Sequence, residues 1–427
     1  MKISGAQIVI ECLAEQGVDT VFGYPGGAIL NIYDELYKNS SRIRHILTAH
    51  EQGASHAADG YARSTGKVGV VMATSGPGAT NLVTGIATAY MDSVPVVAIT
   101  CNVPTPLLGK DSFQEIDITG VTMPITKHNF MVRSVDELAK TIREAFVIAK
   151  SGRPGPVLID IPKEVTANQA EFVPLPAGAS ASASAIEDES LRRILTTATP
   201  QDAEIEAAAS LINSAERPVI YAGGGVVISG AYAELAALAE KANIPVAVSL
   251  MGKCAFPSGH RLCTGMIGMH GTKASNLAAN KSDLILAVGA RFSDRVISDA
   301  KQFAKGSRVF QIDIDPAEIN KNIPTAGSLV GDIADILARL LPLVHERPES
   351  QWNKDVAGWK AQVPASYTQK APLNPKFLFE YAHEALGDEA IVTTEVGQHQ
   401  MWAAQFYPFS KPRTFLTSGG LGTMGYG

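Results

Sequence analysis

The chain has 427 residues, of which 46% are hydrophobic and 18% charged, with 38 glycines and 24 prolines. At roughly 100–200 residues per domain this length predicts two or three domains, and the composition excludes a disordered or fibrous protein. The net charge of -6 gives no basic surface for phosphates, so we expect no nucleic-acid partner.

Neither a membrane protein nor a disulfide-stabilised secreted protein is indicated. No apolar run approaches the roughly 20 residues that a membrane span requires, and Glu11 and Glu15 interrupt the first helical pattern, which leaves no signal-peptide core. The four cysteines show no Cys-x-x-Cys spacing, which argues against a zinc site and a disulfide framework. We therefore expect a cytoplasmic protein with buried thiols and no membrane partner.

Short β-branched runs alternate with amphipathic stretches in residues 1–165, as in βαβ units on a parallel sheet. This pattern predicts a first doubly wound α/β domain, with helices at residues 51–64, 79–90 and 135–151. Residues 166–198 contain a tract of alternating alanine and serine, which predicts a linker.

The alternation resumes in residues 199–342, which predicts a second doubly wound domain. Residues 343–373 predict a second linker, and residues 374–427 contain one helix, one strand and a glycine-rich turn. So few elements cannot form a stable domain, so we expect the chain to end inside a third domain of the same type. The predicted fold class is α/β, with consecutive doubly wound parallel sheets of which the third is incomplete.

The first candidate for chemistry is Glu51, which follows an apolar strand at residues 43–49 and begins a helix. A carboxylate at the carboxyl edge of a parallel sheet stands where α/β proteins bind ligands. An acidic residue in a first helical turn is also favoured by the helix dipole alone. The pattern leaves both interpretations open.

Glycine-rich turns follow strands at two further places. Residues 74–81 join a strand to a helix, and their glycines and free N–H groups would let an anionic ligand approach closely. Gly223, Gly224 and Gly225 form a similar turn, but Ile228 replaces the third glycine of a dinucleotide-binding motif. Each turn alone fits an ordinary connection between a strand and a helix equally well.

Charged residues end two later strands. Asp313 and Asp315 could reach a ribose or an adenine, or could cap the helix that follows them. Arg291 and Arg295 suit bidentate binding of a carboxylate or phosphate, although Arg295 could instead form a structural pair with Asp294.

Taken together and in this order, these segments resemble the large subunits of the acetohydroxyacid synthase (acetolactate synthase) family, which use thiamine diphosphate. Any one segment is weak evidence, whereas the ordered set, which covers the chain from Val21 to Gly427, is specific. The matching segments are residues 22–28, 50–52, 74–81, 152–156, 250–252, 268–272, 313–316 and 395–399.

The resemblance implies that the first domain binds the pyrimidine of thiamine diphosphate, and that Glu51 hydrogen-bonds to its N1′ atom. It places Gly27, Phe113, Gln114 and Lys163 around the reacting carbons, and Arg295 near the carboxylate of the acceptor keto acid. The residues that it implies to be catalytic are Glu51, Gln114, Lys163 and Arg295. The residues that it implies to bind cofactors are Gly27, Gly76, Pro77, Asn81, Arg153, Gly223, Gly224, Gly225, Met269, His270, Gly271, Thr272, Arg291, Asp313, Asp315, Val396, Gly397, Gln398, His399 and Met424.

The implied activity is decarboxylation of pyruvate and transfer of the two-carbon unit to a second 2-keto acid. The product would be acetolactate or acetohydroxybutyrate, in branched-chain amino-acid biosynthesis. The second domain would hold FAD in a structural role. The family's magnesium motif, Gly-Asp-Gly followed by two asparagines, is absent, so the Mg2+ ligands are expected beyond Gly427. A homodimer or dimer of dimers and a regulatory small subunit are further implications of the resemblance.

Other activities share this architecture, among them pyruvate oxidase, sulfoacetaldehyde acetyltransferase and glyoxylate carboligase. Glyoxylate carboligase usually lacks the activating glutamate, so Glu51 counts against it. Catabolic acetolactate synthases usually lack FAD, so the segments of the second domain count against them. In a different class, the chain could be an inactive fragment that binds FAD and a partner subunit.

Overall fold

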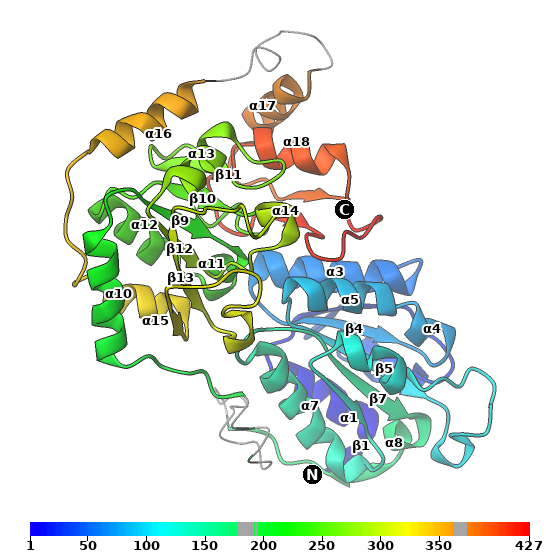
Figure 1. Cartoon of the computed structure of the whole chain (residues 1–427). Helices are drawn as coiled ribbons and strands as arrows, with labels where there is room; N and C mark the ends of the chain where they lie inside the picture. The colour runs from blue at the N-terminus through cyan, green and yellow to red at the C-terminus, as the bar shows by residue number, and fades with distance from the viewer. Residues whose placement is uncertain (177–188, 190–191, 193–194, 363–373) are drawn as a thin grey trace. The chain divides into compact units, whose positions relative to one another are not determined.

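Two compact units make up the chain (Figure 1). The first contains Met1–Thr196 together with Ser418–Tyr426, and the second contains Thr197–Thr417 and Gly427. Each unit has its own core and is described by itself. The computed structural model describes residues 1–176, 189, 192, 195–362 and 374–427.

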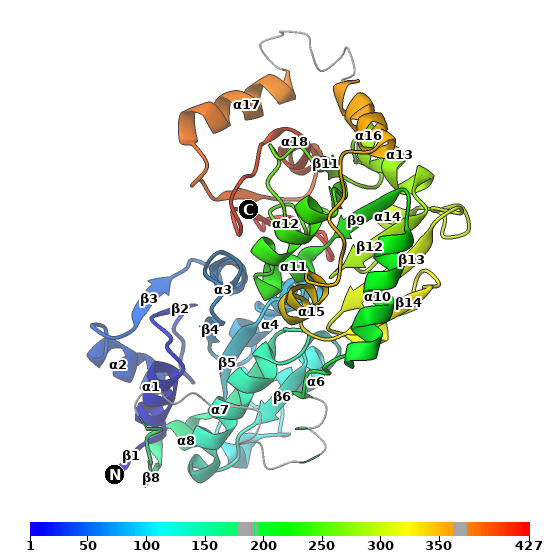
Figure 2. The same ribbon diagram turned by 90° about the vertical axis from the view of Figure 1, so that its left-hand side faces the viewer.

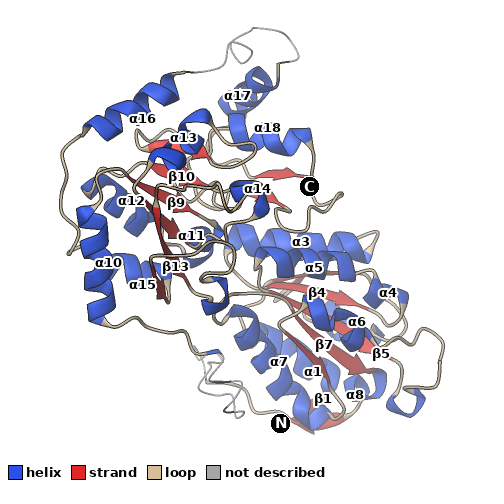
Figure 3. Cartoon of the chain, in the orientation of Figure 1, coloured by secondary structure: helices blue, strands red, loops and turns tan. Residues whose placement is uncertain are grey.

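The first unit is built on a six-stranded parallel sheet in the order β3-β2-β4-β5-β7-β6. Its strands β4, β5 and β7 are labelled among the red arrows of Figure 3. All residues of β4, β5 and β7 are buried, as expected for parallel strands covered by helices on both faces. Outside this sheet, two short strands pair antiparallel, β1 Lys2–Ser4 and β8 Gln169–Glu171. The strands of the sheet are β2 Thr20–Gly23, β3 Arg44–Leu47, β4 Gly69–Ala73, β5 Val96–Asn102, β6 His128–Met131 and β7 Val157–Pro162.

Alternate side chains of the central strands enter two separate cores, one on each face of this sheet. Val70 and Ile99 pack with residues of α1 and α7, whereas Val71 and Ala98 pack with residues of α3 and α5. In Figure 2, α3 and α7 lie on opposite sides of β4 and β5. The helices of the first unit are α1 Gly5–Glu15, α2 Leu30–Lys38, α3 Glu51–Thr65, α4 Pro77–Thr80, α5 Val83–Asp92, α6 Ile118–Thr122, α7 Val135–Lys150 and α8 Lys163–Ala167, with short 3-10 turns at Thr105–Leu107 and Met123–Ile125.

The second unit has a six-stranded parallel sheet in the order β11-β10-β9-β12-β13-β14. Ile220 and Leu286 pack with α10, α12 and α15 on one face, and Val219 and Ile285 pack with α13 and α16 on the other. The strands are β9 Pro218–Ala222, β10 Val246–Val248, β11 Cys263–Met266, β12 Leu284–Val288, β13 Arg308–Asp313 and β14 Gly327–Val330. The helices are α10 Asp202–Ser214, α11 Gly224–Ser229, α12 Tyr232–Lys241, α13 Lys273–Lys281, α14 Asp294–Ile297, α15 Ile333–Leu340 and α16 Gln351–Ala361.

The second unit also contains a small parallel pair of strands with two helices. Strand β15 Val392–Thr394 pairs with β16 Phe415–Thr417, and helices α17 Pro375–Leu386 and α18 Gln398–Phe406 accompany them. Tyr407 and Phe409 form a small core there with Cys254.

The predicted α/β class with doubly wound parallel sheets is confirmed by the two six-stranded sheets. Residues 351–361 of the predicted second linker form α16. Most of residues 177–194 of the first linker, and residues 363–373 of the second, lie outside the described residues, and the predicted domain boundaries stay predictions.

All four cysteines are buried and carry free thiols, as expected from their spacing. Among the described residues, no helix is both long and apolar enough to span a membrane.

Trp352 anchors α16 to the sheet of the second unit, because its buried indole Nε1 donates a hydrogen bond to the carbonyl oxygen of Pro218 at 2.9 Å. We predict that Trp352→Phe lowers the free energy of unfolding by roughly 1–3 kcal/mol, since the buried carbonyl loses its donor. Urea unfolding followed by circular dichroism measures the change. Trp359→Phe is the matched control, because the Trp359 indole has no hydrogen-bond partner among the described residues; equal losses in the two variants would contradict the prediction.

Candidate functional site

The strand order of the first unit creates a point at which successive connections diverge. Strand β3 lies on one side of β2 and strand β4 on the other, so the loops that follow β2 and β4 separate at their carboxyl ends. Such a switch point is where open parallel sheets bind ligands. The segments concerned are the loop of residues 24–29 and residues 74–81, which include the short helix α4. Helix α3, which follows β3, begins at the same edge.

Glycines let these loops approach one another closely. A Cβ atom at Gly26 would lie 2.4 Å from Cγ2 of Thr74, whose Oγ1 accepts a hydrogen bond from the N–H of Ala28 at 3.2 Å. Gly76 has a φ of 57°, and a Cβ atom there would lie 2.8 Å from the carbonyl oxygen of Gln114. Three loops therefore pack so closely here that there is little room for a side chain at Gly26 or Gly76.

Glu51 lies at this edge, in the first turn of α3. His50 caps the helix through its Nδ1, which accepts a hydrogen bond from the N–H of Gln52 at 3.1 Å. The Glu51 residue is only 9% exposed, and its Oε2 accepts a hydrogen bond from Nδ2 of Asn81 at 2.9 Å. No described residue donates a hydrogen bond to Oε1, which faces Gly78, where a Cβ atom would lie 3.2 Å away. A buried carboxylate with one open oxygen suits a ligand that carries an N–H donor.

Only some of the other predicted residues of the first unit lie near Glu51. Pro77 begins α4 beside Gly76, and nothing would lie within 4 Å of a Cβ atom at Gly27. The side chain of Phe113 is 87% exposed. Lys163 is exposed at the carboxyl end of β7, on the same edge of the sheet but beyond β5.

Arg153 precedes β7 and therefore lies toward the amino ends of the strands, away from Glu51. Its Nε donates a hydrogen bond to Oγ of Ser93 at 2.8 Å. Its predicted role in FAD binding stays a prediction.

A buried polar group supports the loop that carries Gln114. Asp160 accepts hydrogen bonds from Thr100 Oγ1 and Asn102 Nδ2, both at 2.7 Å, and the same Nδ2 of Asn102 donates to the carbonyl oxygen of Ile116 at 3.2 Å. Burial raises the pKa of Asp160 to about 6, and the two hydrogen bonds oppose this shift. Sequence reasoning missed this group, since it joins residues far apart in the chain.

The second unit has its own switch point, between β9 and β12. A Cβ atom at Gly223 would lie 2.0 Å from the carbonyl oxygen of Gly289, and one at Gly225 would lie 2.7 Å from the Cα atom of Gly289. The loops after β9 and β12 thus pack backbone to backbone, and Gly224 begins α11 at the same place. This packing explains Gly223 and Gly225 whether or not a ligand binds.

Arg291 follows β12, and Asp313, which is buried, ends the adjacent strand β13. Asp315 caps the short 3-10 helix Pro316–Glu318, since its Oδ1 accepts a hydrogen bond from the N–H of Ala317 at 2.9 Å. The capping interpretation is therefore observed for Asp315. This capping hydrogen bond does not test the predicted role of Asp315 in FAD binding.

Residues 268–272 pack against helix α14, which carries Arg295. The N–H of Met269 donates to the carbonyl oxygen of Arg295 at 2.9 Å. Thr272 caps α13, and the carbonyl oxygen of His270 accepts a hydrogen bond from Gln405 at 2.8 Å. The side chains of Arg295 and Asp294 are both exposed and stand 3.7 Å apart, so this exposed pair contributes little to stability.

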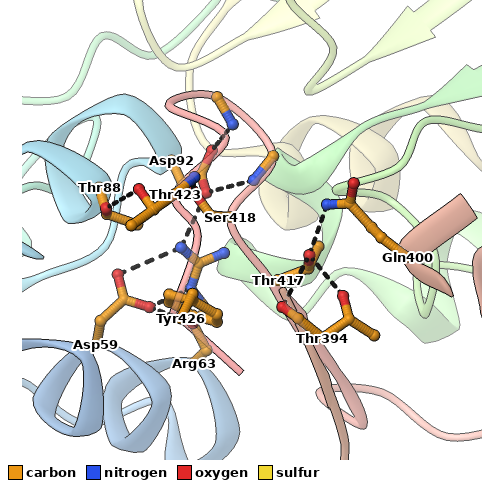
Figure 4. A network of polar contacts seen from close by, with 12 residues as sticks. Asp59, Arg63, Thr88, Asp92, Thr394, Gln400, Thr417, Ser418, Thr423 and Tyr426 are labelled. Carbon is orange, nitrogen blue, oxygen red and sulfur yellow. Dashed lines mark hydrogen bonds and ion pairs between the residues drawn. The ribbon is translucent and has the colours of Figure 1, made fainter. Parts of the chain in front are cut away.

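The predicted residues after β15 lie at the start of α18. Gly397 has a φ of 152° and precedes the exposed side chains of Gln398 and His399. Thr417, which ends β16, accepts hydrogen bonds from Thr394 and Gln400 at 2.9 and 2.7 Å (Figure 4). Met424, which belongs to the first unit, is 73% exposed.

Comparison with known proteins finds three family models in order along the chain. The N-terminal TPP-binding domain of thiamine pyrophosphate enzymes matches residues 3–121, the central domain matches residues 205–340, and the C-terminal TPP-binding domain matches residues 395–427.

Full-length relatives agree with these matches. The acetolactate synthase large subunit of Corynebacterium glutamicum is 48% identical over 432 residues, which cover 100% of this chain and 67% of that protein. The acetolactate synthase of Arthrospira platensis is 48% identical over 442 residues, covering 100% and 74%. The acetolactate synthase isozyme 1 large subunit of Escherichia coli is 45% identical over 428 residues, covering 100% and 73%. The family resemblance inferred from the sequence motifs is confirmed.

The pKa of Asp160 predicts how stability depends on pH. Its folded value near 6 lies above the ordinary value of 3.8, so the folded state holds the proton more tightly than the unfolded chain does. The resulting stabilisation is fully present below about pH 4 and is lost as the pH rises through about 6, by an amount on the order of 3 kcal/mol.

We predict that Asp160→Asn, which is neutral at every pH, removes this dependence. Its free energy of unfolding should rise relative to that of the unaltered protein between about pH 4 and pH 7. Denaturant titrations across this range measure the difference, with Asp136→Asn at an exposed position as the control. Parallel pH profiles for Asp160→Asn and the unaltered protein would contradict the prediction.

Proposed function

The chain belongs to the acetolactate synthase large-subunit family of thiamine pyrophosphate enzymes, and we propose on that premise that it is the catalytic subunit of an acetolactate synthase. In the proposed reaction, one pyruvate loses carbon dioxide and its remaining two carbons are joined to the keto carbon of a second 2-keto acid. With pyruvate as acceptor the product is acetolactate, and with 2-ketobutyrate it is acetohydroxybutyrate.

The observation that carries the proposal is the state of Glu51. This carboxylate is buried at the switch point, is held by Asn81 through Oε2, and has an Oε1 that no described residue donates to. An acidic residue that served only the helix dipole would gain nothing from burial, since exposed first-turn carboxylates are favoured equally well. Glu51 is therefore placed to share a proton with a heterocyclic nitrogen.

The residues present fit thiamine diphosphate in this place. Gly26, Gly76 and Gly78 let the surrounding loops pack closely around Glu51. Glu51 offers the hydrogen-bond acceptor that an aminopyrimidine N1′–H needs. When bound, the cofactor supplies the carbon nucleophile and the electron sink that loss of carbon dioxide requires. Glu51 holds the shared proton on the ring nitrogen, and the packed loops around it exclude water.

The two substrates are anions, and they need positive charge. Lys163 is exposed at the carboxyl edge of the first sheet, and Arg295 is exposed in the second unit. We propose that these two cations bind the substrate carboxylates and that the amide of Gln114 orients the reacting keto group.

A flavin fits the switch point of the second unit. The Gly223–Gly225 turn begins α11 at this switch point, Arg291 follows the neighbouring strand β12, and Asp313 ends the next strand, β13. We propose that FAD binds there, with Asp315, the loop Met269–Thr272 and Arg153 as further contacts. Condensation of two keto acids with loss of carbon dioxide moves no net electrons, so the proposed role of FAD is structural.

We propose no Mg2+ ligands in this part of the chain. Among the described residues, no group of three or more His, Cys, Asp or Glu side chains could hold a metal ion. The relatives are named large subunits, which supports a regulatory small subunit as partner. We further propose a cytoplasmic homodimer or dimer of dimers, in which residues Val396–His399 and Met424 contribute to the thiamine diphosphate site.

We predict that Glu51→Gln lowers kcat by roughly 10²–10⁴, the range expected for a positioned proton-transfer group, while the fold survives. Acetolactate formation at saturating thiamine diphosphate measures the loss. Glu137→Gln is the matched control, because Glu137 lies in the first turn of α7 and shares only the interaction with the helix dipole. Similar activity in the two variants would show that Glu51 serves the helix alone.

The flavin proposal predicts that the purified protein carries FAD and that Asp313→Ala lowers the flavin content several-fold, since a contact to the bound flavin is lost. The absorbance of released flavin per chain measures this content, with Asp299→Ala at an exposed position as the control. The flavin should stay oxidised while pyruvate is consumed. Reduction in step with turnover would instead support an oxidase.

A further inference from the structure

The loop between β5 and α6 keeps its shape with little burial of apolar surface. Residues 104–116, called the Gln114 loop below, are all described by the structure, and none of them is buried. Phe113 at its tip is 87% exposed. Burial of apolar surface is the main force that holds most segments in place. The shape of the Gln114 loop must therefore come mainly from polar contacts.

Polar contacts fix both ends of the Gln114 loop to the rest of the first unit. At one end, the N–H of Thr105 donates a hydrogen bond to Oε1 of Glu164, near the start of α8, at 2.6 Å. At the other end, Nδ2 of Asn102 donates to the carbonyl oxygen of Ile116 at 3.2 Å. The tip between these contacts, residues 106–115, is left to be shaped by its own groups.

The carboxylate of Glu115 organises this tip. It accepts hydrogen bonds from the backbone N–H groups of Ser112 at 2.9 Å, of Lys110 at 3.3 Å and of Gly109. The N–H of Glu115 in turn donates to the carbonyl oxygen of Ser112 at 2.9 Å. The N–H groups of Ser112 and Gly109 lower the pKa of Glu115, because they stabilise its ionised form. One charged side chain thus joins three backbone donors of the tip.

Two residues of the tip have a strained backbone. Asp111 has a φ of 52° and Gln114 a φ of 58°, in the left-handed region that residues other than glycine rarely adopt. Such conformations persist only where the surrounding structure enforces them, and they gather at functional sites. The hydrogen bonds from Gly109 and Lys110 to Glu115 close the chain around both residues. The Glu115 carboxylate is therefore the group that enforces the strain.

The strained backbone of Gln114 lies against the segment that faces Glu51. A Cβ atom at Gly76 would lie 2.9 Å from the Cα atom of Gln114. Two residues further along, a Cβ atom at Gly78 would lie 3.2 Å from Oε1 of Glu51. A change in the shape of the tip would therefore move Gln114 relative to the segment that contacts Glu51.

We propose that Glu115 is a positioning residue, which holds the Gln114 loop in the shape that presents the Gln114 amide to the reacting keto group. This inference rests on the proposed function, in which Gln114 orients that group beside Glu51. The Glu115 carboxylate is turned toward three N–H groups of its own loop, so its effect on the reaction is exerted through Gln114.

Two variants remove the hydrogen bonds by different amounts. Glu115→Ala removes all three, and Glu115→Gln keeps one acceptor oxygen but loses the charge. We expect kcat for acetolactate formation to fall roughly tenfold in Glu115→Ala and less in Glu115→Gln, because a loosely held amide orients the substrate poorly. The concentration of thiamine diphosphate that gives half-maximal activity should stay within about twofold. Glu137→Ala, at an exposed position of α7, is the matched control and should change neither quantity.

Amide hydrogen exchange tests whether Glu115 shapes the tip. In Glu115→Ala, the amides of Gly109, Lys110 and Ser112 should exchange roughly tenfold faster or more, because each loses a hydrogen bond to a charged group. The amides of β4 and β5 should exchange at the rates of the unaltered protein, which shows that the fold is intact.

A double variant tests whether Glu115 acts through Gln114. If it does, Gln114→Ala combined with Glu115→Ala should have a kcat within about twofold of that of Gln114→Ala alone, since the amide that Glu115 positions is already absent. A loss of stability caused by Glu115→Ala would instead add to the effect of Gln114→Ala.

The outcomes separate the positioning role from the proposed function. Unchanged amide exchange in Glu115→Ala, or additive losses in the double variant, would overturn the positioning role alone. Full kcat in Gln114→Ala would show that the Gln114 amide does not orient the substrate, and the positioning role would fall with it. Failure of the unaltered protein to form acetolactate with thiamine diphosphate and magnesium would overturn the proposed function itself, and this role too.

Discussion

Every strand in both six-stranded sheets runs parallel to its neighbours, and the position of each candidate site follows from this constraint. In a parallel sheet the loops after all strands meet at one edge, and a crevice opens where successive connections diverge. In the first unit this places Glu51, which follows β3, beside the loops after β2 and β4. In the second unit it places Gly223 and Arg291 together after β9 and β12. The same geometry brings these loops into close contact, so a Cβ atom would meet the Thr74 side chain at Gly26 and the backbone of Gly289 at Gly223.

Local features of the structure could be predicted from the sequence where local physics decides them. The helix predicted at residues 51–64 is α3 Glu51–Thr65, because His50 caps its start and Gly66, with a φ of 76°, ends it. The single helix predicted at residues 79–90 is instead two helices, α4 and α5, separated near Asn81. The apolar period runs through this break without interruption. The Asn81 amide bonds to Glu51, thirty residues earlier, and no local pattern carries that contact.

The candidate site shows the same limit. The residue types at the strand ends were enough to single out Glu51, the glycine turns and the charged residues near the ends of β12 and β13 as candidates, and their roles stay predictions. The buried ion pairs of Arg63 with Asp59 and Asp92 were missed, because Asp59 and Arg63 at a spacing of four look like an ordinary exposed helix pair. The pair differs from an exposed pair only because it is buried and contacts Asp92 and Tyr426, which are distant in the sequence. Asp315 shows the reverse case, in which a residue assigned to a ligand also has a complete local explanation as a cap.

The four buried thiols divide evenly between the two units, with Cys12 and Cys101 in the first and Cys254 and Cys263 in the second. Burial raises the pKa of Cys12 to about 12 and raises that of Cys101 and Cys254 as well. For Cys12 the reactive thiolate is therefore about a thousandfold scarcer near neutral pH than in an exposed cysteine. Alkylating reagents can reach such sulfurs only when the surrounding layers open. The rate at which each pair of cysteines is alkylated therefore measures how often its own unit unfolds locally, without any added label.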